Sequence, residues 1–174
     1  RSVPPTSLRT RMEGYMPKPN TIVAFDIGNT RTKCALIGEH VIAPAFSVLT
    51  EPAETLAARL AIIRQESKRV IPTGAECVAS SVHPAANAEI RQFWRENDGE
   101  SVQFFGPDLS LPIETEVEEP EKTGTDRLLC AIGARELKGS PCIVVMAGTA
   151  ITVDLIDAAG RFAGGAIAPG MSMC

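Results

Sequence analysis

The sequence predicts an α/β fold in which each half of the chain opens with a meander of three strands. Short runs rich in β-branched and apolar residues, separated by glycine-containing turns, occupy 21–49 and again 142–170. Segments with apolar residues at helical spacing lie between these two regions. The strand, tight turn and second strand of FDIGNTRTK recur as VMAGTAITVD, which indicates an internal duplication.

In the first half, two helices and two further strands follow the meander. Leu56, Leu60 and Ile63 recur at helical spacing and predict an amphipathic helix that ends near Val70. Pro84 is suited to the first turn of a second helix, because it has no backbone N–H to leave unpaired there. The predicted elements are strands at 21–28, 30–37 and 40–49, a helix to about 70, a strand at 76–81, a helix over 84–98 and a strand at 101–105.

A proline-rich acidic connector at 106–122 separates the two halves. We therefore expect a disordered extension at 1–19, a first lobe at 20–115 and the start of a second lobe at 116–174. Within the second lobe, Thr123 is predicted to cap a helix that Gly139 closes. Strands are then predicted at 142–148, 149–157 and 161–170, and because the chain stops soon after them we expect this lobe to be incomplete.

Composition excludes several classes of protein. The 174 residues are 44% hydrophobic without an apolar run near the roughly 18 residues of a membrane span, which predicts a soluble globular protein. With 5% aromatic residues and a net charge of −4, neither nucleic acid nor a membrane is an expected partner. Because the chain has two histidines, a metal site built from a cluster of histidines is not expected. Five widely spaced cysteines predict free thiols and a cytoplasmic location.

Two similar turns carry the strongest chemical signal. Gly28-Asn29-Thr30 and Gly148-Thr149-Ala150 each place a glycine and a hydroxyl between two apolar strands. Such a turn brings backbone N–H groups close to an anion, and two of them facing each other would hold a polyphosphate. Asp26 is placed to hold Mg²⁺ through water, and Lys33 to offset phosphate charge. Either turn alone could be an ordinary hairpin, but their duplication favours phosphate binding.

The order of the motifs resembles that of a known family. DIGNTRTK, SSVHP, GTDRL, AGTAITVD and GGAIAPG follow one another between residues 22 and 171. In this order they resemble the type III pantothenate kinases, a branch of the actin, Hsp70 and sugar-kinase ATPase superfamily. The resemblance implies two ribonuclease-H-like lobes with ATP between them. It also implies a homodimer that phosphorylates pantothenate to 4'-phosphopantothenate, the first step of coenzyme A biosynthesis.

The resemblance also assigns residues. Asp126 would be the catalytic proton acceptor, and Asp26 would bind Mg²⁺ through water. The implied ATP-binding residues are Asp26, Ile27, Gly28, Asn29, Thr30, Arg31, Thr32, Lys33, Gly148 and Thr149. The implied substrate-binding residues are Gly124, Thr125, Asp126 and Arg127. From the residues alone, Asp126 and Arg127 could equally be a helix N-terminal acid beside a surface arginine.

Two positions depart from the family pattern. Met146 stands where the family carries an aspartate that binds a monovalent cation, K⁺ or NH₄⁺, and a thioether is a poor ligand for a hard cation. We therefore expect Met146 not to be a ligand. Val117 stands where we expect a tyrosine that contacts substrate. These departures favour one alternative, a non-catalytic regulator on the same fold. A second alternative is another small-molecule kinase or phosphatase of the superfamily.

Overall fold

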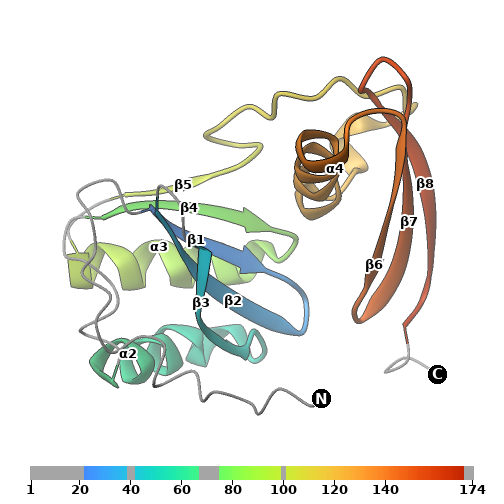
Figure 1. Cartoon of the computed structure of the whole chain (residues 1–174). Helices are drawn as coiled ribbons and strands as arrows, with labels where there is room; N and C mark the ends of the chain where they lie inside the picture. Colours follow the sequence, from blue (N-terminus) through green and yellow to red (C-terminus); the bar gives the residue numbers. More distant parts are fainter. Residues whose placement is uncertain (1–21, 39–41, 67–74, 99–100, 171–174) are drawn as a thin grey trace, which may run out of the picture.

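The computed structural model describes residues 22–38, 42–66, 75–98 and 101–170, and it contains two sheets (Figure 1). The five-stranded sheet has the order β3-β2-β1-β4-β5, and the three-stranded sheet has the order β6-β7-β8. The predicted extension at 1–19 lies outside the described residues. The strands are β1 (Ile22–Ile27), β2 (Arg31–Ile37), β3 (Ile42–Leu49), β4 (Glu76–Ser81), β5 (Val102–Phe104), β6 (Cys142–Ala147), β7 (Ala150–Ile156) and β8 (Phe162–Pro169).

The five-stranded sheet confirms the first predicted meander. β1 pairs with β2, and β2 with β3, in antiparallel fashion, whereas β4 adds to the other side of β1 in parallel. β5 then pairs in parallel with β4. A parallel pair needs a crossover connection, and the helix that follows β3 provides it. The carboxyl ends of β1 and β4 therefore lie side by side.

Helices α2 (Leu56–Glu66) and α3 (Pro84–Asp98) pack against each other and cover one face of this sheet (Figure 1). Leu56 and Leu60 of α2 are buried, as their helical spacing predicts. The predicted end of α2 near Val70 lies outside the described residues. α3 begins at the predicted Pro84. We refer to the five-stranded sheet with these two helices as the first lobe.

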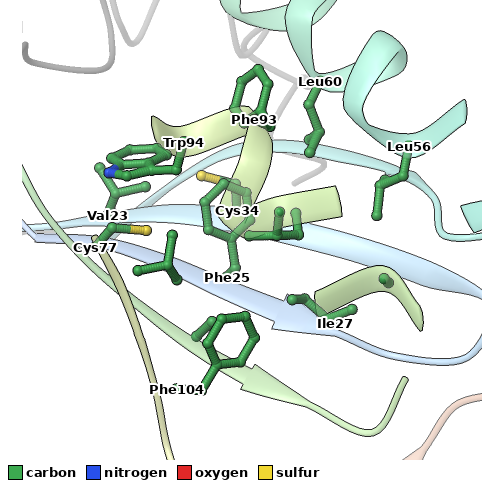
Figure 2. Close-up of a cluster of buried hydrophobic side chains, with 14 of the residues drawn as sticks. Val23, Phe25, Ile27, Cys34, Leu56, Leu60, Cys77, Phe93, Trp94 and Phe104 are labelled. Atoms are coloured by element: carbon green, nitrogen blue, oxygen red, sulfur yellow. The ribbon is translucent and has the colours of Figure 1, made fainter. Parts of the chain in front are cut away.

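The main hydrophobic core lies between the first sheet and its helices (Figure 2). Alternate residues of β1, namely Val23, Phe25 and Ile27, are buried, which is the period of two expected for a strand with one buried face. The ring of Trp94 from α3 meets that of Phe25 edge-on, with centroids 5.9 Å apart and planes at 84°. The aromatic pair therefore joins the longest described helix to the central strand of the sheet.

Helix α4 (Thr125–Lys138) lies between the two sheets and packs on β4, β6 and β7 (Figure 1). The prediction that Thr123 caps this helix was wrong. The residue at the N-cap is Gly124, and no side chain caps the helix. Thr123 is used differently, because its N–H bonds to the carbonyl of Pro120 and ends the 3₁₀ turn Pro120–Lys122. Gly139 ends α4 with a φ of 80°, as predicted.

The three-stranded sheet confirms the second meander, since β7 pairs in antiparallel fashion with both β6 and β8. A small core lies between this sheet and α4, and its four buried side chains are Leu128 and Ala131 of α4, Ile156 of β7 and Phe162 of β8. On β6 and β7 the alternate side chains are exposed, among them Ile143 and Val145. We refer to this sheet with α4 as the second lobe. Its core is much smaller than that of the first lobe.

Four cysteines lie among the described residues, and all of them are free thiols, as predicted. Cys34 and Cys77 are buried in the first sheet, and burial raises the pKa of the Cys34 thiol to about 12. Cys142 is half-buried, and Cys130 is exposed. Over the described residues, no helix combines the length and the apolar character that crossing a membrane requires.

The turn between β7 and β8 makes the free energy of unfolding depend on pH in the acid range. Asp157 accepts the backbone N–H of Arg161 at 2.8 Å and its Nε at 2.9 Å, so these bonds lower the pKa of Asp157 below its ordinary value of 3.8. The folded state then binds fewer protons than the unfolded state, so the stabilisation is present above pH 3.8 and is lost as the pH falls through the folded pKa.

We therefore expect Asp157→Asn to lower the free energy of unfolding at neutral pH, with a difference from wild type that shrinks below pH 3.8. Urea unfolding of both proteins at a series of pH values measures this difference. A difference that is constant down to the lowest pH would contradict the assignment. Glu118→Gln, which replaces an exposed carboxylate in the connector, is the control.

Candidate functional site

Asp26 lies near the carboxyl end of β1, between partners on both neighbouring strands. It is paired with Lys33 in β2 and with Ser80 in β4. The Nζ of Lys33 lies 3.1 Å from Oδ2 of Asp26, and the two side chains are 63% and 49% exposed. An exposed ion pair of this kind adds little stability, so both charged groups remain accessible to a ligand.

The two duplicated turns meet at this end of the first sheet. Thr30 Oγ1 and Thr149 Oγ1 lie 2.8 Å apart and share a hydrogen bond, although 119 residues separate them in the sequence. Each turn is closed by a backbone bond of its glycine, from Gly28 N–H to the carbonyl of Arg31 and from Gly148 N–H to that of Ala150. The predicted phosphate-binding turns therefore face each other, with both hydroxyls exposed.

Three other residues of the first motif point elsewhere. Ile27 belongs to the hydrophobic core, and Thr32 is buried with its hydroxyl 3.0 Å from that of Thr50. Arg31 lies along β3, where its Nε donates to Ser47 Oγ at 2.8 Å. Ile27 and Thr32 support the turn from the buried side, whereas the exposed members of the motif are Asn29, Thr30, Arg31 and Lys33.

The start of α4 is fixed to the first lobe next to Asp26. Thr125 Oγ1 accepts a hydrogen bond from Ser80 Oγ and donates one to the carbonyl of Ser81, both at 3.3 Å. Because Ser80 is the β4 partner of Asp26, these bonds bring Asp126 into the neighbourhood of Asp26. Sequence reasoning missed the role of Ser80, because only the parallel pairing of β1 and β4 reveals it.

The carboxylate of Asp126 folds back over Gly124. Its Oδ1 accepts the N–H of Arg127 at 2.9 Å. A Cβ placed on Gly124 would lie 2.4 Å from the same oxygen, well inside contact distance. Gly124 therefore leaves the space that this position of the Asp126 carboxylate requires.

The pKa of Cys130 is influenced by charged groups of both lobes. It lies one helical turn after Asp126 on α4. Although the residue is exposed, the atoms that desolvate its thiol raise the thiol's pKa most; the negative charges of Asp126, Asp26 and Asp154 raise it further, while Lys33 lowers it. Charged residues of β1, β2, α4 and β7 therefore all influence the pKa of this one thiol. Sequence analysis did not identify Cys130, although its spacing of four from Asp126 was visible.

Arg127 points into the second lobe. Its Nε lies 3.0 Å from Oδ1 of Asp154, and its Nη2 also donates to that oxygen. Asp154 is fully buried, whereas the side chain of Arg127 is 14% exposed. The guanidinium also lies over the ring of Phe162, 5.5 Å from its centroid. Arg127 is therefore held by β7 and β8 while its backbone belongs to the helix start that carries Asp126.

The two positions that depart from the family pattern occupy ordinary places in the second lobe. Val117 packs against the core that contains Leu128 and Phe162. Met146 is half-buried on β6 and is paired with Thr152 on β7. Among the described residues, no group of three His, Cys, Asp or Glu side chains could hold a metal ion by itself.

Comparison with known proteins identifies the family. The family model for type III pantothenate kinase matches residues 22–174. The chain belongs to the type III pantothenate kinase family. It is 33% identical over 153 residues to the type III pantothenate kinase of Nitratidesulfovibrio vulgaris, a match that covers 84% of this chain. It is 32% identical over 155 residues to that of Rubrobacter xylanophilus, covering 86% of this chain. The chain spans 58% of the length of both of these relatives.

Solved structures show the same fold. A protein from Sinorhizobium meliloti assigned as a 2-dehydro-3-deoxygalactonokinase aligns with a TM-score of 0.56 at 17% identity, covering 84% of this chain and 52% of its own. The ethanolamine utilization protein EutJ from Carboxydothermus hydrogenoformans aligns with a TM-score of 0.52 at 14% identity, covering 89% and 53%. The two lobes therefore have the fold of actin-like ATPases and sugar kinases, as the family resemblance implies.

Proposed function

We propose that the protein transfers the γ-phosphoryl group of ATP to the primary hydroxyl of pantothenate. The convergence of Asp126, Asp26 and the two threonine turns at the junction of the lobes carries this proposal, because family membership alone names an activity without assigning residues. We also propose that the chain divides into lobes at 20–115 and 116–174, because the strands of the five-stranded sheet precede this boundary and those of the three-stranded sheet follow it. The pantothenate kinase names of the relatives support the choice of substrate.

Asp126 is the proposed catalytic base. It is the acidic residue in the first turn of α4, and its carboxylate is only partly buried. A carboxylate in this position can accept the proton of a substrate hydroxyl as that hydroxyl attacks phosphorus. Such a base contributes roughly 10²-fold to 10⁴-fold to the rate, and charge neutralisation and positioning supply most of the remainder.

Asp26, Thr30, Lys33 and Thr149 are the proposed contacts for Mg²⁺-ATP. A half-exposed carboxylate beside exposed hydroxyls and an ammonium group fits a magnesium triphosphate, because Mg²⁺ keeps several waters and needs few protein ligands. The absence of a three-ligand cluster in the described part of the chain is compatible with that mode of binding. When bound, the nucleotide supplies the phosphoryl group, and the ion offsets its charge.

The experiment that tests the proposal is a turnover assay on the full-length protein with pantothenate and Mg²⁺-ATP. We expect 4'-phosphopantothenate and ADP in equal amounts, measured by mass spectrometry. K⁺ and NH₄⁺ are tested separately, because Met146 replaces the family's cation ligand. Failure with both cations would contradict the proposal and favour a non-catalytic regulator. Faster turnover of a sugar than of pantothenate would favour another small-molecule kinase.

Gly124→Ala tests whether this glycine positions Asp126. The added methyl group would lie 2.4 Å from the Asp126 carboxylate and displace it. The same methyl group would lie 3.5 Å from the Val82 side chain, which is an ordinary van der Waals distance. We expect kcat to fall about tenfold with the free energy of unfolding changed by less than about 1 kcal/mol. The matched control is Gly133→Ala in the same helix, where a Cβ meets nothing within 4 Å. Equal kcat values for the two variants would contradict the proposed positioning.

We also propose a homodimer and a cytoplasmic location. The family resemblance supports the dimer, because members build their substrate pocket at the dimer interface. Light scattering on the full-length protein measures the molar mass and distinguishes a dimer from a monomer. The free thiols of the described cysteines are compatible with a reducing compartment.

A further inference from the structure

A buried carboxylate outside the proposed contacts for substrate and Mg²⁺-ATP has a hydrogen-bond donor at each of its two oxygens. Asp154 on β7 is fully buried and accepts two N–H groups of Arg127. Its other oxygen, Oδ2, lies 3.3 Å from the hydroxyl of Thr152, which donates to it. Both carboxylate oxygens are thus hydrogen-bonded, as a charged group without access to water requires.

The neighbouring strand is adapted to this carboxylate. Gly165 on β8 is the register partner of Asp154. A Cβ on Gly165 would lie 2.5 Å from Oδ1 of Asp154 and 2.1 Å from the carbonyl oxygen of Val153. No side chain larger than hydrogen fits there, so β8 leaves the space that the ion pair occupies.

Stability alone does not account for such a pair. Removing two charges from water costs about as much as their attraction returns, so a buried ion pair is weak evidence for stabilisation. The pair does determine a position. It fixes the guanidinium of Arg127, the residue that follows Asp126, relative to β7 and β8. Among the described residues, Asp154 and the ring of Phe162 are the groups that hold the guanidinium of Arg127.

We infer that Asp154 is a positioning residue that holds Arg127 in the orientation in which it contacts pantothenate. The inference rests on the proposed function. Asp154 touches no substrate and acts through Arg127, so its loss affects substrate binding more than the chemical step.

The first test is a set of kinetic measurements on the full-length protein. For Asp154→Asn we expect the KM for pantothenate to rise roughly tenfold to hundredfold, the factor that corresponds to loss of a hydrogen bond to a charged group. The KM for ATP and kcat are expected to stay within about threefold. In an Arg127→Ala background the same substitution should add no further effect, because the group through which Asp154 acts is gone. Additive effects, or a lower melting temperature with an unchanged KM, would overturn the inference.

Two further variants complete the set. Thr152→Val keeps the size of the side chain and removes only its bond to Asp154, so a smaller rise of the same KM is expected even if Asp154→Asn does not fold. Asp157→Asn is the matched control, since Asp157 also pairs with an arginine, Arg161, but lies past the opposite end of β7 from Thr149. A rise of the pantothenate KM in this control equal to that in Asp154→Asn would count against a specific role.

A second measurement separates this inference from the proposed function. Phenylglyoxal modifies accessible guanidinium groups, and peptide mass spectrometry follows the labelling of Arg127 without any need for activity. We expect labelling to be at least about tenfold faster in Asp154→Asn than in wild type and unchanged in Asp157→Asn. If wild type fails to phosphorylate pantothenate but this acceleration is found, the proposed function is wrong, whereas the role of Asp154 in holding Arg127 is confirmed. Equal labelling rates in all three proteins would contradict the inference that Asp154 holds Arg127 in place.

Discussion

Asp126→Asn is expected to reduce kcat for pantothenate phosphorylation about a thousandfold while the KM for pantothenate changes less than about threefold. The amide keeps the size of the carboxylate and its bond to the Arg127 N–H, because the side-chain oxygen can still accept it. It cannot accept the proton of the substrate hydroxyl. The loss therefore falls on the chemical step and spares binding.

Steady-state kinetics with saturating Mg²⁺-ATP measure this effect, and thermal unfolding shows whether the variant is folded. Asp157→Asn is the control, because it makes the same chemical change in a carboxylate past the far end of β7, roughly 26 Å along that strand from Thr149. A kcat within tenfold of wild type would mean that Asp126 is not the base. The convergence of Asp26 and the two turns would then support nucleotide binding alone.

Trp94→Ala is expected to lower the free energy of unfolding by about 3–5 kcal/mol. Trp94 is the only tryptophan of the chain, it is fully buried on α3, and its ring meets Phe25 of the central strand. Alanine would leave a cavity at the point where the helix layer joins the sheet. A loss of this size is a large fraction of the 5–15 kcal/mol that stabilises an ordinary domain.

Urea unfolding followed by circular dichroism measures the loss, since the variant has no tryptophan fluorescence. Trp94→Phe keeps an aromatic ring in the same place and should lose less than the alanine variant. Leu137→Ser, at a side chain that is 80% exposed, should stay within about 0.5 kcal/mol of wild type. A loss below about 1 kcal/mol for Trp94→Ala would contradict the assignment of the main core to this layer.

Local signals explain why most elements could be predicted. The strands at 22–27 and 76–81 have short β-rich runs with clear ends, and Pro84 and Gly139 mark helix boundaries by their restricted or permissive backbone. The cap at Thr123 failed for a local reason as well: the preceding 3₁₀ turn used the backbone of Thr123, so the helix began one residue later. Such competition between adjacent turns leaves no trace in residue type.

Local residue patterns are enough to predict the two meanders, the duplicated turns and, through the order of the motifs, the family to which the chain belongs. Which residues come together depends on the packing of the whole chain. The hydrogen bond between Thr30 and Thr149 joins residues that are 119 positions apart in the sequence. The position of Asp126 near Asp26 depends on the parallel pairing of β1 with β4. Asp154, whose partner no local pattern indicates, is likewise found paired with Arg127. Contacts of this kind depend on strand register and helix packing, which no local pattern of residues encodes.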